Sequence, residues 1–376
     1  MFDDRAIGMA ALVFVFALAV AVGCIRDEPL CPYADIEDFA LPENVMMGKA
    51  TINGEQISVF ARKGADLSAL VPEIRLSEGA SVSPDAGTPQ DFTRQVAYTV
   101  TAADGKHSRE YTVRLTSVPL YSYGFERWEV LDKKYAYETP VEYDRQGNTT
   151  TPWDSSNKGI SIYQQYSSPS LYPIHRTTQS ASGEYAAEML TLDGPGSILG
   201  ITNIPIVAGS LFTGTLHPLN ALSNPLLATE FGQPFDAKPL KMTGKYIYKA
   251  GAGSYIDSNG RAHAEKKDSC NVYAVLFHTG GGLDRLNGTN VLSHANIVAV
   301  AMMSPEERAG SEGEGFADFD LPFVYREGHA LDFEKNSYKL AVIFSSSFMG
   351  DYYEGTPGSR LVVDDIEIIT EEMYDE

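Results

Sequence analysis

Basic residues and cysteines are scarce in this sequence, and both shortages narrow its possible functions. Lysines and arginines number 29 against 50 aspartates and glutamates, which gives a formal net charge of -21 over 376 residues. A nucleic-acid partner is therefore not expected, because few cations are available to neutralise phosphate groups. Three cysteines are too few for a disulfide framework, and no CxxC or Cys/His spacing typical of a zinc site occurs.

The sequence also lacks the short motifs of familiar catalytic sites. It contains no GxSxG nucleophile turn, and its histidines show no HExxH spacing. The serines Ser345, Ser346 and Ser347 follow an apolar run, but without the glycine turn that a nucleophilic serine needs. We expect these serines to form hydrogen bonds at the end of a strand.

Long apolar runs are absent except near the N-terminus. Residues 6–23 carry no charge and lead into AVGC, whose last letter is Cys24, and this resembles the lipobox of bacterial lipoprotein signal peptides. The resemblance implies that residues 1–23 are a cleaved signal peptide, that Cys24 carries the lipid and that residues 24–32 are a tether. An uncleaved anchor is the alternative, because the run is just long enough to span a membrane. We expect a lipid-anchored protein of the outer membrane, at its cell-surface or periplasmic face.

Helical patterns are also few, and short apolar runs separated by glycine and proline recur instead. Within residues 33–118, two pairs of runs flank Asn-Gly and Asp-Gly turns, and apolar residues alternate with polar ones. The pairs are 49–52 with 56–60 around Asn53-Gly54, and 95–101 with 108–116 around Asp104-Gly105. Short, regular strands predict an Ig-like β-sandwich. The phrases LSEGASVSPDAGTPQDF and VAYTVTAADGKHSREYTV resemble an Ig-like module of Bacteroidota cell-surface lipoproteins, which implies a spacer or interaction domain.

Residues 119–376 show no linker and predict one large β-sandwich of jelly-roll type, so the whole chain is predicted to be all-β. The expected strands cover residues 240–249, 271–277, 297–302, 316–325, 338–344 and 361–369, with one helical turn at 305–308. The run 338–344 is apolar apart from Lys339, and we expect it to be deeply buried. The loop that follows it is longer than an ordinary hairpin connection, which is typical of functional loops.

Five phrases in this second part resemble the putative carbohydrate metabolism domain, PCMD, of Bacteroidota lipoproteins. They are GFERW (124–128), TPWDSSNKG (151–159), PFDAKPLKMTGKYIYK (234–249), LPFVY (321–325) and SSSFMGDYYEGTPGSRLVVDDIEI (345–368). The resemblance covers most of residues 120–370 in the expected order. It implies a β-jelly roll related in shape to carbohydrate-binding modules, without a settled reaction.

Sugar recognition needs flat aromatic faces with a few amide or carboxylate partners for hydroxyl groups. Two segments offer this set, one with Trp153, Asp154 and Asn157 and the other with Asp351, Tyr352 and Tyr353. We predict that the two segments lie on one face and form a glycan platform. The alternative is that Trp153 packs in the core, as we expect for Trp128.

Glycoside hydrolysis would require two carboxylates flanking the bond, about 5 Å apart for retention or about 6.5–9.5 Å apart for inversion. The candidates are Glu126, Glu129, Asp154, Asp351 and Glu354, and no motif singles out a pair. Non-catalytic glycan binding in a polysaccharide-utilisation system is therefore the favoured function. A glycoside hydrolase with an Asp/Glu pair and a structural or adhesin-like surface protein remain as alternatives.

A structural calcium ion is the one cofactor that the sequence suggests, because many carbohydrate-binding jelly rolls join their first and last strands through such an ion. Glu126 lies in the expected first strand, and Asp364 and Asp365 lie in the last. Their carboxylate oxygens suit calcium. Neighbouring strand residues point to opposite faces, so only one of the two aspartates is expected to face the ion.

Overall fold

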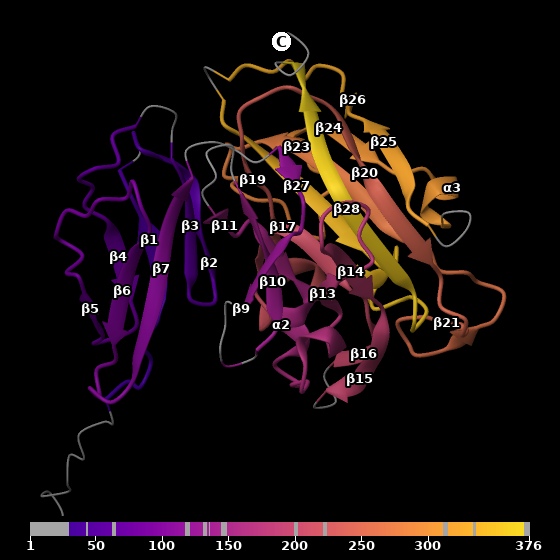
Figure 1. The fold of residues 1–376 in the computed structure, drawn as a ribbon, viewed down its shortest axis with the longest axis horizontal. Helices are drawn as coiled ribbons and strands as arrows, with labels where there is room; N and C mark the ends of the chain where they lie inside the picture. Colours follow the sequence, from indigo (N-terminus) through magenta and orange to yellow (C-terminus); the bar gives the residue numbers. More distant parts are fainter. Residues whose placement is uncertain are drawn as a thin grey trace, which may run out of the picture.

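The computed structural model describes residues 30–371 apart from positions 43, 62–64, 117–120, 131–133, 135, 144–148, 199–201, 221–223, 311–314 and 334–335. The described chain is nearly all β and forms two sandwiches that lie side by side (Figure 1). This confirms the predicted class, an Ig-like sandwich followed by a jelly-roll sandwich. The predicted signal peptide and Cys24 lie outside the described residues. Among the described residues, no helix is long and apolar enough to cross a membrane.

The first sandwich packs a five-stranded sheet, in the order β2-β3-β7-β6-β5, against the pair β1-β4. Its strands are β1 (Ile36–Ala40), β2 (Met46–Asn53), β3 (Gln56–Ala61), β4 (Glu73–Leu76), β5 (Ser81–Ser83), β6 (Val96–Thr101) and β7 (Ser108–Thr116). The two predicted hairpins are β2–β3 and β6–β7, and parallel pairing of β3 with β7 joins them. The apolar residues of this sandwich form a core of their own, which includes Phe39 of β1 with Tyr98 and Tyr111 of the second hairpin.

Buried polar groups join the first sandwich to the second. The Asn53 side-chain amide donates to the carbonyl oxygen of Trp153 at 2.9 Å, and the hydroxyls of Ser58 and Thr151 lie 2.8 Å apart. Asn53 and Ser58 belong to β2 and β3, and each is at least 96% shielded from solvent. Buried polar groups are normally paired, so these contacts define how the two sandwiches meet.

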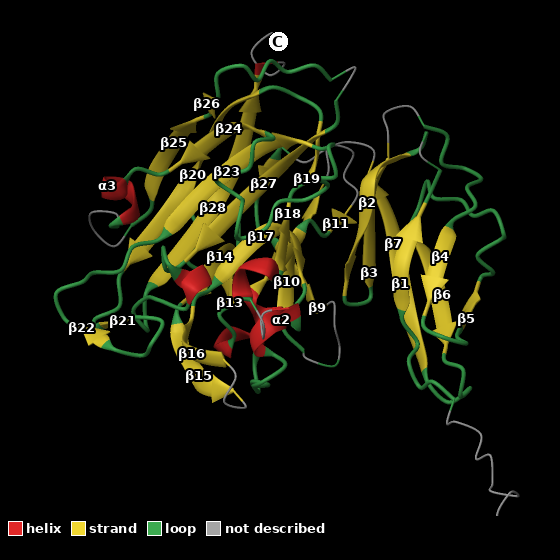
Figure 2. Cartoon of the chain, turned by 180° about the vertical axis from the view of Figure 1, so that it is seen from behind, coloured by secondary structure: helices red, strands yellow, loops and turns green. Residues whose placement is uncertain are grey.

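The second sandwich packs an eight-stranded sheet against a six-stranded sheet (Figures 1 and 2). The eight-stranded sheet has β12 (Trp153–Ser155), β17 (Ser210–Leu216), β18 (Thr229–Phe231), β19 (Gln233–Phe235), β23 (Asn271–His278), β24 (Ile297–Met302), β26 (Val324–Tyr325) and β27 (Tyr338–Ser345). The six-stranded sheet has β8 (Ser122–Tyr123), β13 (Ile174–Thr177), β14 (Ala186–Leu190), β20 (Pro239–Lys249), β25 (Ala317–Pro322) and β28 (Arg360–Thr370).

Strand β27 lies in the middle of the eight-stranded sheet, and all of its residues are buried. On one face, Val342 and Phe344 pack into the core between the two sheets. On the other face, Ala341 and Ile343 pack into a separate apolar cluster. A strand that is covered on both faces has to be apolar at successive positions. The expected deep burial of residues 338–344 is therefore confirmed.

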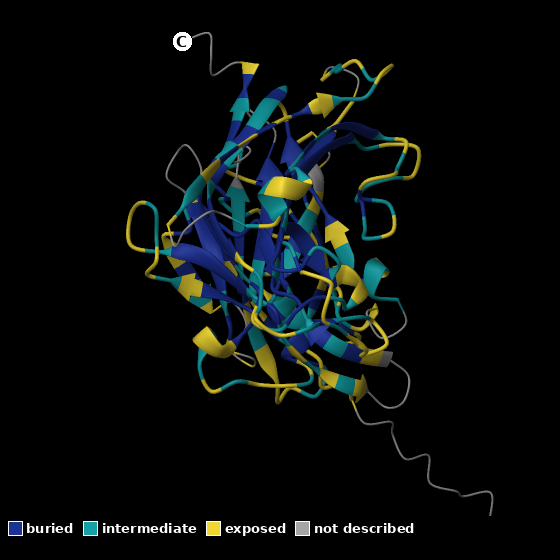
Figure 3. Cartoon of the chain, turned by 90° about the vertical axis from the view of Figure 1, so that its right-hand side faces the viewer, coloured by how far each residue is buried: buried dark blue, intermediate teal, exposed yellow. Residues whose placement is uncertain are grey.

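The remaining elements lie around the rim of the second sandwich. They are β9 (Arg127–Val130), β10 (Glu138–Tyr143), β11 (Thr149–Thr150), β15 (Leu192–Ile198), β16 (Thr202–Val207), β21 (Tyr255–Ile256), β22 (Ala262–His263), the helices α2 (Ser156–Ile160) and α3 (Pro305–Arg308), and the 3-10 turns η1 (Pro169–Leu171), η3 (Pro225–Leu227) and η4 (Gly350–Tyr352). Figure 3 shows buried strands at the centre and exposed loops around them. The helical turn expected at residues 305–308 is α3, which Ser304 and Glu307 cap reciprocally.

Candidate functional site

A cleft lies over the outer face of the eight-stranded sheet, the face that points away from the six-stranded sheet. Strand register places Ser210, Ser345 and Asn271 in one row across β17, β27 and β23. The next outward-facing row consists of Phe212, Ile343 and Tyr273. Because side chains of a strand alternate between faces, these two rows form a continuous floor that changes from polar to apolar.

The cleft has a volume of about 180 Å³, and loops far apart in the sequence form its walls. One wall comes from α2 and the residues after it, and another from the end of β16. The turns η3 and η4 lie against each other and complete the enclosure. The long loop after β27, which contains η4, is therefore part of this cleft.

The polar row holds an acceptor without a partner. The Oδ1 atom of Asn271 is buried, and no described residue donates a hydrogen bond to it. The hydroxyls of Ser210 and Ser345 lie 3.1 Å apart, and Ser345 also donates to the carbonyl oxygen of Ser347 at 2.9 Å. A buried acceptor that lacks a donor costs free energy. A ligand hydroxyl that donates to Asn271 would remove this cost.

Asp351 enters the cleft from η4 and gives it a titratable group. The residue as a whole is exposed, but desolvation of its carboxylate raises its pKa to about 6. Burial, with a smaller effect from the charge of Asp351, raises the pKa of Tyr273. Asp351 is the only acid among the described lining residues, which include no lysine, arginine or histidine. The site therefore has one weak carboxylic acid among neutral groups.

The loop that carries Asp351 is fixed at its base by Asp268. This buried carboxylate accepts hydrogen bonds from the Ser347 hydroxyl at 2.6 Å, the Thr356 backbone N–H at 2.8 Å and the Ser359 hydroxyl at 2.8 Å. These donors come from both ends of the loop, so the Asp268 side chain holds the two ends together. The hydrogen bonds to Asp268 thereby position the loop residues between the two ends, which line the cleft.

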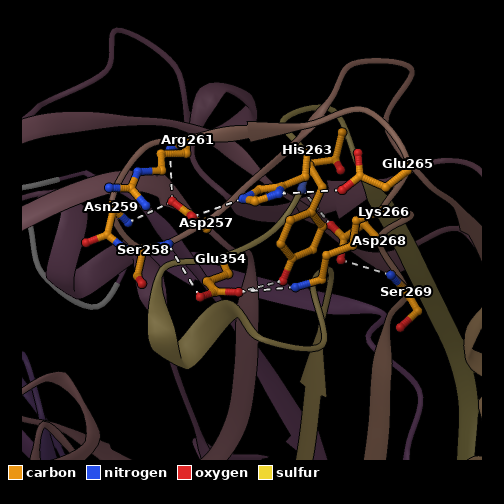
Figure 4. Close-up of polar contacts among 12 residues, drawn as sticks. Asp257, Ser258, Asn259, Arg261, His263, Glu265, Lys266, Asp268, Ser269 and Glu354 are labelled. Atoms are coloured by element: carbon orange, nitrogen blue, oxygen red, sulfur yellow. Dashed lines mark hydrogen bonds and ion pairs between the residues drawn. The ribbon is translucent and has the colours of Figure 1, made fainter.

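Glu354 fixes the other side of the same loop against the segment that carries β21 and β22. Its carboxylate accepts hydrogen bonds from the Tyr255 hydroxyl at 3.1 Å and the Lys266 ammonium at 3.3 Å. Figure 4 shows Glu354 between Ser258 and Lys266, within a network that also contains Asp257 and His263. Glu354 is thus occupied with anchoring and is not among the described residues that line the cleft.

Trp153 does not belong to a glycan platform, and this prediction is wrong. The ring has no exposed surface and packs edge-on against Tyr123, with ring centroids 4.8 Å apart. It also lies 5.9 Å from the Phe344 ring, between the two sheets. A ring without exposed surface cannot stack on a sugar. Trp153 is therefore a core residue, which was the alternative prediction. Trp128 is also buried, as expected.

Asp154 and Asn157 are buried as well, and their polar atoms bind the chain itself. Asp154 accepts hydrogen bonds from the Leu216 backbone N–H at 2.7 Å and the Lys158 ammonium at 3.0 Å. Asn157 exchanges two hydrogen bonds with the backbone of Ile174, at 2.7 and 2.8 Å. Both side chains hold α2 on the sheet, so their predicted role in ligand binding is also wrong.

The second predicted segment does reach the cleft. Asp351 and Tyr353 are among the residues that line it. Tyr353 adopts a left-handed backbone conformation with φ 60°, which turns the chain at the end of η4. Tyr352 is 47% exposed and lies outside the described lining. A ligand-binding role for these three residues remains a proposal.

The predicted calcium ligands approach one segment but do not assemble a metal site. Asp364 accepts hydrogen bonds from the backbone N–H groups of Ala181 at 2.7 Å and Ser182 at 3.3 Å, and Asp365 accepts one from the Ser182 hydroxyl at 2.6 Å. Glu126 accepts one from the N–H of residue 184 at 2.9 Å. No group of three or more acids, histidines or cysteines within the described part of the chain could hold a metal ion. Protein donors occupy these carboxylates, so the predicted ligand set is not formed.

The expectation that only one of the two aspartates faces this segment is also wrong, for a local reason. The pairing of β20 with β28 slips next to Asp364, and Asp365 has a φ of 50°. Such a bulge breaks the alternation of side chains along a strand. Both aspartates therefore contact the residues around Ser182.

The candidate carboxylates for glycoside hydrolysis are dispersed. Glu129 pairs with Arg127 on β9, whereas Glu126, Asp154 and Glu354 bind the groups described above. Only Asp351 lies in the described lining of the cleft. The cleft thus lacks the second carboxylate within its described lining that a conventional glycosidase mechanism uses.

Sequence reasoning missed Asn271, Tyr273 and Ser210 as site residues. Each lies at an outward position of a strand, and these strands are separated by many residues in the sequence. Their pairing with β27 depends on register, which no local pattern reveals. The one available signal is the pair of polar residues, Asn271 and Ser345, at the ends of two largely apolar strands.

The fold and the cleft define a class of protein, a two-sandwich β protein with a partly aromatic cleft over a jelly-roll sheet. The chain belongs to the putative carbohydrate metabolism domain family, whose model matches residues 124–369. A second model, described as SGBP, N-terminal, matches residues 36–115. These matches give the protein a carbohydrate-related function, and the SGBP-type domain indicates a surface- or envelope-associated protein.

Two solved structures from Bacteroides resemble the chain. A protein of Bacteroides thetaiotaomicron described as a putative glycoside hydrolase is 34% identical, with a TM-score of 0.83 over 92% of this chain and 99% of that one. A protein of Bacteroides vulgatus with the same description is 29% identical, with a TM-score of 0.61 over 68% of this chain and 100% of that one. No match was found among curated proteins.

Proposed function

We propose that the cleft over the eight-stranded sheet binds a glycan without cleaving it. The cleft offers hydrogen-bonding groups in the polar row and three partly exposed rings in its lining, Tyr163, Phe348 and Tyr353, which is the combination that sugar recognition uses. Asn271 supplies a buried acceptor that has no donor among the described residues. The carbohydrate-related family and the SGBP-type domain support the same function.

A single observation favours binding over hydrolysis. Asp351 is the only acid in the described lining. A retaining or inverting glycosidase ordinarily positions two carboxylates, about 5 Å or about 6.5–9.5 Å apart, across the bond that it cleaves. With one carboxylate, the cleft can orient and hold a sugar. Its described lining offers no second carboxylate to act as nucleophile or base on the other side of the glycosidic bond.

Glycoside hydrolysis is the second candidate, and one feature favours it. The pKa of Asp351 is raised to about 6, as it is for the general acids of glycosidases. The two similar Bacteroides structures are also described as putative glycoside hydrolases. In this alternative, Asp351 would protonate the leaving oxygen, and a second group would have to come from outside the described lining.

We further propose that the protein is a lipoprotein of the outer membrane in a polysaccharide-utilisation system, anchored through Cys24. The first sandwich would then act as a spacer between the lipid and the cleft. Labelling with a radioactive fatty acid in a Bacteroidota host tests the anchor. Wild type should take up label and Cys24→Ala should not, whereas equal labelling of both would contradict the proposal.

Two assays on residues 33–376 separate binding from hydrolysis. A glycan array should identify at least one bound oligosaccharide. Incubation with that oligosaccharide should then release no reducing sugar. Release that disappears in Asp351→Asn would establish the hydrolase, and the absence of any bound glycan would contradict both candidates.

A further inference from the structure

The charges of the cleft disfavour anionic ligands. No described lining residue is cationic, and the one ionisable acid, Asp351, would repel a uronate, sulfate or phosphate group. The chain as a whole carries a net charge of -21, which adds to this repulsion. Acidic glycans therefore meet no cationic side chain in the described lining and no favourable electrostatic potential at the cleft.

Polar groups cover only a small part of the cleft. Apart from Thr229 and the tyrosine hydroxyls, the polar side chains of the described lining gather around the row of Ser210, Ser345 and Asn271 and at Asp351. The hydroxyl of Ser156 belongs to the same group, because it accepts a hydrogen bond from the Ser210 N–H at 3.1 Å. Most of the hydrogen-bonding capacity for a ligand thus lies around this row and at Asp351.

The rest of the lining is largely aliphatic. Leu216 lies six residues beyond Ser210 on β17, so it is on the order of 20 Å further along the strand. The other aliphatic lining residues include Pro218, Pro225, Leu226 and Val291, and the turn η3 with Leu226 contacts the turn η4 that carries Asp351. Ile204 and Val207 line the cleft from the end of β16, only three to six residues before Ser210. These side chains offer no partner for a hydroxyl group. Because a sugar hydroxyl buried among them would lose its hydrogen bonds to water, an unsubstituted sugar ring fits this part poorly.

We propose that the cleft takes an uncharged oligosaccharide that carries an apolar acyl or aryl ester group. The sugar hydroxyls lie at the polar row and at Asp351, and the ester group lies among the aliphatic residues near Leu226. This inference rests on the proposed glycan binding and specifies its ligand class. Burial of the ester group contributes affinity through the hydrophobic effect, which an unsubstituted glycan cannot use.

A pair of probes that differ only in their ester groups tests this proposal. Acetylated and feruloylated xylo-oligosaccharides are titrated into residues 33–376 before and after mild alkaline treatment, which removes the esters and leaves the sugar chain. We expect the esterified probe to bind at least tenfold more tightly than its saponified counterpart. Equal or weaker binding of the esterified probe would overturn the proposal.

Two adjacent leucines of η3 supply a matched pair of variants. Leu226 lines the cleft, whereas Leu227 is 45% exposed and lies outside the described lining. Leu226→Ala should weaken binding of the esterified probe by about tenfold and leave the saponified probe unaffected, and Leu227→Ala should change neither. Equal effects of the two variants would overturn the placement of the ester group.

The outcomes distinguish this proposal from the proposed function. If an array shows binding only of unesterified or anionic glycans, glycan binding stands and the ligand class proposed here fails. If no glycan binds, esterified or not, both fail. Binding of free ferulate as tight as that of the feruloylated probe would show an aromatic-acid site and would also overturn the proposal.

Discussion

The indole N–H of Trp153 donates a hydrogen bond to a carboxylate oxygen of Glu142 at 3.0 Å, inside the second sandwich. Glu142 is only 4% exposed, and its other carboxylate oxygen accepts from the backbone N–H of Gly124 at 3.2 Å. Burial raises the pKa of Glu142 to about 7, although these hydrogen bonds oppose the shift. Trp153, a ligand-binding candidate by residue type, thus forms a buried pair with Glu142.

Glu142 should make stability decrease as pH rises through the neutral range. Between its ordinary pKa near 4.5 and its folded pKa of about 7, the folded chain holds a proton that the unfolded chain releases. Its contribution to the free energy of unfolding therefore falls from pH 4.5 to pH 7. Relative to wild type, Glu142→Gln should gain on the order of 3 kcal/mol between pH 5 and pH 8. Urea unfolding at several pH values measures this difference, and parallel pH profiles of the two proteins would contradict the account.

Trp153→Ala should destabilise the fold strongly. The substitution removes a fully buried ring and leaves Glu142 without its indole donor. Loss of a buried tryptophan costs about 3–5 kcal/mol. The control is Tyr352→Ala, whose side chain is 47% exposed and whose removal should change stability by less than about 0.5 kcal/mol. Thermal unfolding with similar effects for both variants would argue against a core role for Trp153.

Asp268→Ala should loosen the loop that carries Asp351. Three donors, on Ser347, Thr356 and Ser359, lose their shared acceptor. Each buried donor left without a partner costs about 1–3 kcal/mol. Hydrogen exchange should show faster exchange at residues 347–359 than in wild type, with strands β20 and β28 unchanged. Uniform acceleration across the sandwich, or none at the loop, would contradict the anchoring role.

Glycan affinity should rise as pH increases from 5 to 7. The ionised carboxylate of Asp351 accepts hydrogen bonds from hydroxyl groups more strongly than the protonated form, and its pKa is about 6. Affinity is therefore lowest below pH 6, where the carboxylate holds its proton. Titration calorimetry at pH 5, 6 and 7 should show this trend in wild type and its absence in Asp351→Asn. The same pH dependence in both proteins would exclude Asp351 from the ligand contact.

Much of the fold follows from local sequence pattern. The expected strands at 271–277 and 338–344 correspond to β23 and β27, because β-branched and apolar residues at successive positions suit strands that are covered on both faces. The hairpins at Asn-Gly and Asp-Gly are found because turn chemistry acts over a few residues.

The site is harder to predict, because it depends on contacts between distant segments. Trp153 is a strong aromatic candidate by residue type, but only the packing of Phe344 and Tyr123 around it shows that it is buried. The alternation rule fails at Asp365, where a bulge with a positive φ turns both aspartates toward one segment. The polar row of Ser210, Ser345 and Asn271 exists only through strand register, which the sequence does not encode locally.

Titration of a glycan identified on the array into wild type and Asn271→Leu tests the central claim most directly. The variant keeps the size of the side chain but removes the acceptor that has no donor among the described residues. Affinity should fall by about tenfold or more, as expected for one lost hydrogen bond of about 1.4 kcal/mol. Thermal stability should stay equal or rise, because an unpaired buried polar group is removed. Unchanged affinity with intact stability would show that the glycan binds elsewhere and would contradict the assignment of this cleft.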